Sequence, residues 1–270
     1  MGSAPFFVER IFDVQVTHVY SRPDREGDNV SECSFIELAA TSLRAGTLQG
    51  SGKRAKLTAY HEHEITEDTD ELPKVLSEHI TSLASRMKVS GGSVVFGLSS
   101  KYLIYRVADF PFSDKKRVAR TLPFQIEENL PLAVDEVVID MFEISRSEEG
   151  SKWFACCVPR KLLRAILEAC EAARLDPVSV SPSFAGLTNL PQSKDNSLVI
   201  DVGEETTNLL IVSNGSIRFC RSLRLAGKTL TRAVADAQSV DLEVAQEIKH
   251  GFEGFENGDE TLRDILMNEV

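Results

Sequence analysis

Apolar positions recur along this chain with two different periods, which predict a mixture of strands and helices. Residues spaced three or four apart along one face predict helices over 70–88 and 160–175. Short apolar runs bounded by turn residues predict strands, and these runs cover residues 35–40, 56–60, 94–96, 102–107, 137–144, 153–158 and 178–180. This interleaved order is typical of an α/β protein.

Capping residues mark where two of the helices should begin. In the first, Asp70 can cap the N-terminus, and Pro73 lies in the first turn, where proline is tolerated. A further helix is expected to begin at Asp114 with Ser113 as its cap. Pro123 should kink or break that helix, because proline lacks an N–H and its ring collides with the preceding turn.

The C-terminal part of the chain repeats the order of the N-terminal part. A strand, a hairpin and a helix follow one another first from Ser34 and again from Leu198, which indicates two related lobes. Asn214-Gly215 between apolar runs predicts a tight hairpin in the second lobe. The chain is therefore predicted to have an N-terminal extension over 1–33 with a strand at 8–20, a first lobe over 34–195, and a second, incomplete lobe over 196–270.

The apolar run at residues 198–202 ends in a group of residues suited to bind phosphate. Asp201, Gly203 and Thr206 place a carboxylate, backbone N–H groups and a hydroxyl at one turn, as a phosphate–magnesium group requires. Asp201 would hold magnesium through water. The alternative is a strand-end aspartate that accepts hydrogen bonds from turn N–H groups. Glu204 and Glu205 would repel a γ-phosphate at this turn.

Composition excludes several classes of function. The net charge of −11 argues against duplex nucleic acid or an anionic membrane surface as the main partner. The five cysteines are odd in number and lack C-x-x-C spacing, which favours reduced thiols in a cytosolic protein over a zinc site. No apolar run has transmembrane length and no signal sequence is visible, so we expect the chain itself not to span a membrane.

Two further motifs resemble known sites, a nucleotide-binding loop and a metal site, but each lacks a residue that the site requires. Gly227-Lys228-Thr229 resembles the end of a Walker A loop, yet Ser222 stands where the required glycine would be. A turn before a helix over residues 229–237 is the favoured interpretation. The segment His61-Glu62-His63-Glu64 offers two histidines on one strand face without an identifiable third metal ligand, so a solvated strand end is favoured.

One long stretch carries a more specific resemblance. Residues 121–142, TLPFQIEENLPLAVDEVVIDMF, resemble the PilM family, whose members are cytoplasmic actin-like proteins of type IV pilus assembly related to the cytoplasmic part of the type II secretion protein GspL. Further segments follow the family order from about Ser34 to Gly251: Asp201-Val-Gly-Glu-Glu-Thr, Asn214-Gly215, Phe219-Cys-Arg221, Ala226-Gly227, Leu230-Thr231 and Ala245-Gln-Glu247-Ile-Lys249.

The resemblance implies an actin-like (ribonuclease H-like) α/β ATPase fold, with a small subdomain inserted at about residues 91–144 and a partial second lobe. ATP with magnesium is the cofactor such a fold would take. The family opens with a phosphate loop Asp-Ile-Gly-Ser-Ser-Ser-Val-Lys followed by a short strand. The matching residues here are Glu37, Ala39, Thr41 and Arg44. The longer acid, the lost glycine and the bulkier cation all make nucleotide binding at this loop the weaker expectation.

The nucleoside side of the site departs from the family as well. By resemblance Gly227 belongs to the nucleotide site, and Glu247 and Lys249 lie near the nucleoside, but the Gly-Gly loop that holds adenosine is not found. The alternative is that Glu247 and Lys249 lie on a solvated helix face, with Val244 and Ile248 inward. Either the chain is a piece of a longer protein or its second lobe is truncated, and the sequence leaves both open.

The resemblance therefore implies a scaffold with a degenerate nucleotide site and no assigned catalytic residue. Such a protein is cytoplasmic, lies at the inner membrane of a type IV pilus or type II secretion system through its partners, and binds the cytoplasmic tail of a PilN-like membrane protein and an assembly ATPase. Phe110, Phe112 and Phe124 are candidate anchors for the tail, against the alternative that they are ordinary core. An ATP-binding protein of the FtsA type and the cytoplasmic domain of a GspL-like bitopic protein are the alternatives.

Overall fold

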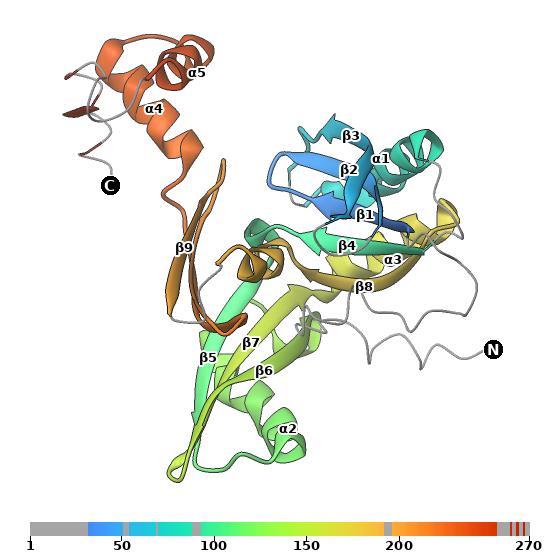
Figure 1. Cartoon of the computed structure of the whole chain (residues 1–270), viewed down its shortest axis with the longest axis vertical. Helices are drawn as coiled ribbons and strands as arrows, with labels where there is room; N and C mark the ends of the chain where they lie inside the picture. Colours follow the sequence, from blue (N-terminus) through green and yellow to red (C-terminus); the bar gives the residue numbers. More distant parts are fainter. Residues whose placement is uncertain are drawn as a thin grey trace. The chain divides into compact units, whose positions relative to one another are not determined.

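The computed structural model describes residues 32–50, 54–68, 70–87, 93–191 and 196–252, with single positions at 260, 263, 264 and 267. The chain divides into two compact units, residues 1–190 and 191–270 (Figure 1). Nearly all of the predicted extension, including the strand expected at 8–20, lies outside the described residues.

The first unit contains a five-stranded mixed sheet. Its strands, in spatial order, are β3 (Lys56–Glu64), β2 (Ser42–Gln49), β1 (Glu32–Leu38), β4 (Ser93–Leu98) and β8 (Asp176–Pro182). The first three pair antiparallel, whereas β4 runs parallel to both β1 and β8. Helices α1 (Leu72–Arg86) and α3 (Arg160–Ala172) pack side by side and bury their apolar stripes. Alternate residues of the strands, such as Ile36 and Phe96, are fully buried, as expected for a sheet covered by helices.

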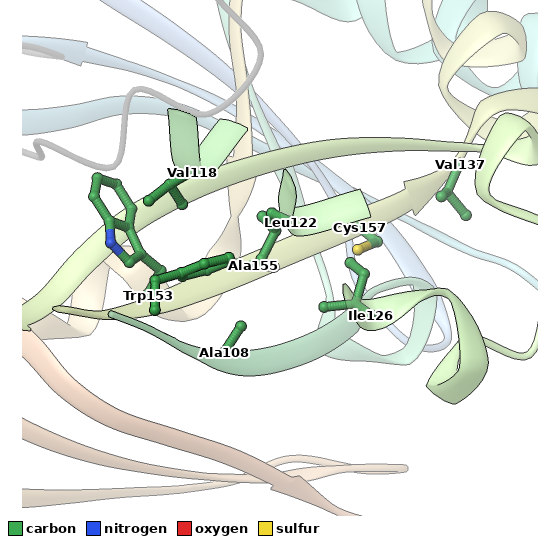
Figure 2. Close-up of a cluster of buried hydrophobic side chains, with 9 residues drawn as sticks. Ala108, Val118, Leu122, Ile126, Val137, Trp153, Ala155 and Cys157 are labelled. Atoms are coloured by element: carbon green, nitrogen blue, oxygen red, sulfur yellow. The ribbon is translucent and has the colours of Figure 1, made fainter. Parts of the chain in front are cut away.

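A smaller sheet is inserted in the chain between β4 and α3, and together with one helix it forms a two-layer subdomain. It consists of the antiparallel strands β5 (Ile104–Phe110), β7 (Gly150–Pro159) and β6 (Val137–Ser147) in that order, with α2 (Lys115–Ile126) on one face. Val118, Leu122 and Ile126 of α2 point toward the sheet and pack with Trp153 and Ala155 of β7 (Figure 2). The small inserted subdomain was expected at about residues 91–144, but this core continues through β7 to Cys157.

The remaining elements of the first unit are short 3₁₀ helices at the ends of strands and helices. They are η4 (Ser100–Tyr102), η5 (Glu127–Asn129), η6 (Val134–Glu136) and η7 (Ser183–Asn189). Within the described part of the chain, no helix is both long enough and apolar enough to cross a membrane.

Over residues 196–252, the second unit forms a three-stranded antiparallel sheet and two helices. The sheet has the order β11 (Ser216–Leu223), β10 (Thr207–Ser213), β9 (Ser197–Val202), and the helices are α4 (Gly227–Gln238) and α5 (Leu242–His250). Asn214 and Gly215 have φ of 51° and 71°, so the predicted Asn-Gly hairpin turn is confirmed. The helices pack through Val234 and Ala245 with Ile248 against them, whereas Val244 is 40% exposed and not inward as expected.

Two helix starts differ from the sequence-based expectation. The N-cap of α1 is Glu71, which makes no side-chain hydrogen bond, so Asp70 is not the cap. The helix instead uses buried Leu72 at its first position, and the backbone N–H of Leu72 donates to the carbonyl of Asp68 at 2.9 Å. In α2 the cap is Asp114 and not Ser113, because the Asp114 carboxylate accepts a hydrogen bond from the N–H of Arg117 at 2.8 Å.

Pro123 does not break α2, which continues through it to Ile126. Proline removes one helical hydrogen bond, but Leu122 and Ile126 on either side of it are 1% and 3% exposed against the sheet. Burying these two side chains offsets the loss, since each is worth about 1.5–3 kcal/mol when fully buried.

Candidate functional site

The first candidate loop, residues 39–41, joins β1 to β2 at the position of the expected first phosphate loop. Glu37, Arg44 and Glu62 are neighbours in the register of three adjacent strands. The Arg44 guanidinium contacts the Glu62 carboxylate at 2.9 Å and the Glu37 carboxylate at 3.7 Å. The cation that should face phosphate therefore lies between two carboxylates of its own sheet.

Glu62 is the centre of this network. Besides Arg44, its carboxylate accepts hydrogen bonds from the hydroxyls of Ser42 at 2.7 Å and Tyr60 at 2.8 Å. The hydrogen bond from Ser42, followed by those from Arg44 and Tyr60, lowers the pKa of Glu62 to about 2. Glu62 thus stays ionised at any physiological pH and keeps Arg44 engaged.

The backbone of the first loop is also held by internal hydrogen bonds. The N–H of Ala39 donates to the carbonyl of Ser42 at 2.9 Å, and the carbonyl of Thr41 accepts from the N–H of Ile65 at 2.8 Å. The ammonium of Lys101 donates to the carbonyl of Ala40 at 2.9 Å. Lys101 thus donates to a loop carbonyl, and the N–H of Ala39 already has a partner. A phosphate-binding loop would instead direct its N–H groups at the phosphate.

In the second unit, Asp201 belongs to a chain of polar side chains that crosses the sheet. Its carboxylate accepts a hydrogen bond from the Asn208 amide at 3.0 Å, and the Asn208 amide oxygen accepts from the Ser222 hydroxyl at 2.6 Å. The three residues are register neighbours on β9, β10 and β11. The partner of Asp201 is therefore a side chain of the next strand, which neither of the two sequence-based interpretations named.

The turn after Asp201 uses its main-chain groups internally. The N–H of Gly203 donates to the carbonyl of Thr206 at 3.0 Å, which closes the turn. The first N–H groups of α4, from Gly227 and Lys228, donate to the carbonyls of Gly203 and Glu204 at 2.9 and 2.8 Å. The N-terminus of α4 is an anion site in principle, but here two of its donors already have loop carbonyls as partners.

Lys249 joins α5 to α4. Its ammonium donates to the Gly227 carbonyl at 3.0 Å, the Thr231 hydroxyl at 2.8 Å and the Gln246 amide oxygen at 3.0 Å. Burial lowers the pKa of Lys249, and the nearby charge of Glu204 opposes that shift. Glu247 is exposed. Residues two apart on a helix do not share a face, so Glu247 and Lys249 do not face a common ligand.

The residues present do not fit ATP with magnesium in the manner that the resemblance implies. Arg44 is bound by carboxylates in one loop, and the amides of Gly203 and Gly227 are bound by carbonyls around the other. The Asp201 carboxylate already accepts a hydrogen bond from the Asn208 amide. No cluster of three or more His, Cys, Asp or Glu side chains that suits a metal ion occurs among the residues the structure describes.

The three candidate aromatic anchors have very different environments. Phe110 is 4% exposed in the core of the inserted subdomain, and Phe112 is half-buried with its ring centre 5.4 Å from that of Phe110. The Arg117 guanidinium lies 3.9 Å from the centre of the Phe112 ring. Phe124 is 74% exposed on α2. Only Phe124 is available to a partner as an anchor without repacking.

The cysteines are all free thiols, and four of the five are buried. Burial raises the pKa of Cys170 and of Cys220 to about 12, so these two are unreactive at neutral pH. In the segment at 61–64, the ring of His63 lies 4.6 Å from that of His79, and Glu62 belongs to the Arg44 network.

Several residues of these networks were not identified from the sequence. Glu62 and Tyr60 lie on β3, and Asn208 and Ser222 lie on β10 and β11, so all four become partners only through strand pairing. The alternation of the strands was a usable signal for the faces of these side chains, but the register that brings them together has no signature in a single sequence.

Comparisons with known proteins identify the family and the fold of this chain. A family model described as type IV pilus assembly protein PilM matches residues 36–262. Among solved structures, the PilM-PilN type IV pilus biogenesis complex is 24% identical with a TM-score of 0.69, covering 88% of this chain and 73% of that chain. The cytoplasmic domain of EpsL, an inner-membrane component of the type II secretion system of Vibrio cholerae, is 16% identical with a TM-score of 0.51, covering 88% and 94%.

A curated relative, the cell division protein FtsA of Staphylococcus epidermidis, is 24% identical over 86 residues, which is 32% of this chain. The matched segment spans only 18% of the length of that relative. The fold is therefore an actin-like ATPase fold with mixed α/β sheets. Since the family model matches well over half of the chain, the protein belongs to the type IV pilus assembly protein PilM family.

Proposed function

We propose that this protein is a cytoplasmic adaptor in a type IV pilus or type II secretion platform at the inner membrane. In this role it binds the cytoplasmic tail of a PilN-like membrane protein and passes on the state of an assembly ATPase, without turning over nucleotide itself. The observation that carries the proposal is the Glu37–Arg44–Glu62 network, because it engages the cation that an actin-like ATPase would aim at phosphate.

The inserted subdomain supports the binding part of the proposal. The structural relative with a TM-score of 0.69 is a complex of PilM with PilN. In this chain, β5 is an edge strand of the inserted sheet, and its Val107 is 48% exposed. An extended tail can add to such an edge through main-chain hydrogen bonds, while an exposed aromatic such as Phe124 supplies an apolar anchor.

Capture of the tail by purified protein tests this role. We expect immobilised cytoplasmic tails of PilN-like membrane proteins to retain the wild type, and Phe124→Ala to weaken retention about tenfold or more, as hot-spot aromatics do. Asp201→Ala is the matched control and should bind as the wild type does. Failure of every tail to bind the wild type would reject the adaptor role.

A second function is supported by the motif that the chain retains. Asp201, Gly203 and Thr206 keep the order of an actin-like phosphate loop, and part of the chain matches FtsA. An FtsA-type ATP-binding protein would show magnesium-dependent binding of ATP in calorimetry. We expect no saturable heat at millimolar ATP, and tight binding would replace the adaptor proposal with this one.

A further inference from the structure

Helix α2 carries a cluster of positively charged side chains at its N-terminus, where positive charge destabilises a helix. Lys115, Lys116 and Arg117 occupy its first turn, which contains no acidic residue, and Arg120 follows one turn later. The N-terminus of a helix is the positive end of its macrodipole, so cations there reduce helix stability. The Asp114 cap offsets only part of this effect. The arrangement creates a strongly positive surface within a chain of net charge −11.

These cations have no anionic partner in the part of the chain that the structure describes. Lys115, Lys116 and Arg120 form no ion pair there, and Arg117 lies over the Phe112 ring. Other cations of the same chain are paired: Arg146 with Glu143 at 2.6 Å and Lys152 with Asp109 at 3.5 Å. The charge of α2 is thus left for a ligand from outside.

The outward face of α2 orders these groups in a line. Val118, Leu122 and Ile126 point into the core, as Figure 2 shows. Lys116, Arg120 and Phe124 are also spaced four apart, on the opposite side of the helix, and all three are exposed. From Lys116 to Phe124 the line extends about 12 Å, at about 1.5 Å per residue. Two cations and one apolar ring therefore form a single narrow stripe.

We propose that this stripe, Lys116–Arg120–Phe124, binds an acidic segment of a partner protein. Carboxylates of the segment would pair with Lys116 and Arg120, and an apolar side chain further along would cover Phe124. An extended segment spans the stripe in about four residues, at about 3.3 Å per residue. The inference rests on the proposed adaptor function and adds the chemistry of what the adaptor binds at this helix.

A short segment fits this surface better than an anionic membrane does. Glu127 and Glu128 follow α2 directly, and Asp135 and Glu136 come soon after; all four are exposed. A lipid surface broad enough to reach Lys116 and Arg120 would meet carboxylates in the same subdomain and be repelled by them. A segment that lies along the stripe contacts the cations and ends at Phe124, before these acids.

Fluorescence anisotropy with a labelled synthetic peptide tests the inference. The probe carries four consecutive glutamates followed by Ser-Gly-Leu-Leu, and comparison peptides replace the glutamates by glutamines or the leucines by serines. We expect saturable binding to the full chain that weakens about tenfold or more in the double variant Lys116→Gln/Arg120→Gln, because charge-assisted hydrogen bonds are lost. Phe124→Ser should reduce the contribution of the leucines alone.

The matched control removes the same charge from another exposed helix surface. Lys161 and Arg164 on α3 are exposed, and Lys161→Gln/Arg164→Gln should leave peptide affinity unchanged. Circular dichroism of each variant establishes that it is folded. Equal weakening by both double variants would show a nonspecific charge effect and overturn the proposal. So would binding to phosphatidylglycerol vesicles without binding to the peptide.

The same variants separate this inference from the adaptor role. If Phe124→Ala abolishes capture of the membrane-protein tail but Lys116→Gln/Arg120→Gln alters neither tail nor peptide binding, the adaptor role stands and the acidic segment is rejected. If the peptide binds as expected while no tail is captured, the stripe is a docking site and the adaptor role fails.

Discussion

The two loops at the phosphate-loop positions of this fold have lost free donors in different ways. The first loop changed its residues, and the remaining cation, Arg44, is held by Glu37 and Glu62. The second loop kept Asp201 and Gly203, but the N–H of Gly203 and the first two N–H groups of α4 bond to main-chain carbonyls. The difference teaches that a retained motif identifies ancestry, whereas ligand binding depends on whether its donors are unoccupied.

The largest effect should come from adding a methyl group to the second turn. In Gly203→Ala the new Cβ would lie 2.8 Å from the Thr206 carbonyl oxygen, a contact that forces the turn to shift. We expect a loss of about 1–3 kcal/mol in the free energy of unfolding, typical of overpacked sites. Urea denaturation measures it.

The reverse change in the first loop is its control. Ala39 is 8% exposed and already fits, so Ala39→Gly should cost less, about 0.4–1 kcal/mol, chiefly through the greater entropy of the unfolded chain. If Ala39→Gly were the more damaging of the two, the second turn would not be the tighter one.

A smaller loss of stability is expected from replacing Lys249, which connects α5 to the start of α4. Lys249→Met removes three donated hydrogen bonds, to Gly227, Thr231 and Gln246, and should destabilise the protein by about 1–2 kcal/mol. Thermal unfolding followed by circular dichroism measures the change. Lys228→Met is the control, because it removes only a half-exposed ion pair with Glu205 and should cost below about 0.5 kcal/mol. Equal losses of stability in the two variants would contradict a stabilising role for the hydrogen bonds of Lys249.

The smallest effect should be the acid sensitivity of the first loop. The folded-state pKa of Glu62 is about 2 against an ordinary value of 4.5, so its ionised form contributes stability above pH 4.5 that is lost as the pH falls toward 2. Because Glu62 is 42% exposed, solvent screens the interaction and we expect about 1 kcal/mol or less.

Denaturation of the wild type and Glu62→Gln at several pH values measures this contribution. The gap between their unfolding free energies should be present at pH 6 and shrink below pH 4. A gap that is constant over this range would mean that ionised Glu62 is not what holds Arg44.

Strong local signals in the sequence predicted most of the elements. The stripe of α1, the Asn214-Gly215 hairpin and the apolar runs of β4 and β9 are clear periodic or turn signatures, and each element was found. By contrast, β2 has no clear alternation because Arg44 and Gly46 interrupt it. The resemblance to a family implied a short strand there, but the apolar pattern did not.

Packing explains why β2 nevertheless forms. It lies between β1 and β3, and Gly46 sits where a Cβ would be 2.7 Å from the Phe35 ring and 2.8 Å from the Ala59 carbonyl oxygen. A glycine that weakens the strand by propensity is required by the close approach of its neighbours. In the same way, tertiary packing keeps α2 helical through Pro123.

By itself, the sequence determined the class of fold, the family and the changed residues of the first loop, because these depend on local pattern and residue identity. Only the tertiary structure decided that Arg44 is held by Glu62, that Asp201 is bonded to Asn208, and that Phe110 is core while Phe124 is exposed. The physical reason is that strand register and burial join residues far apart in the chain, and no local pattern encodes those partners.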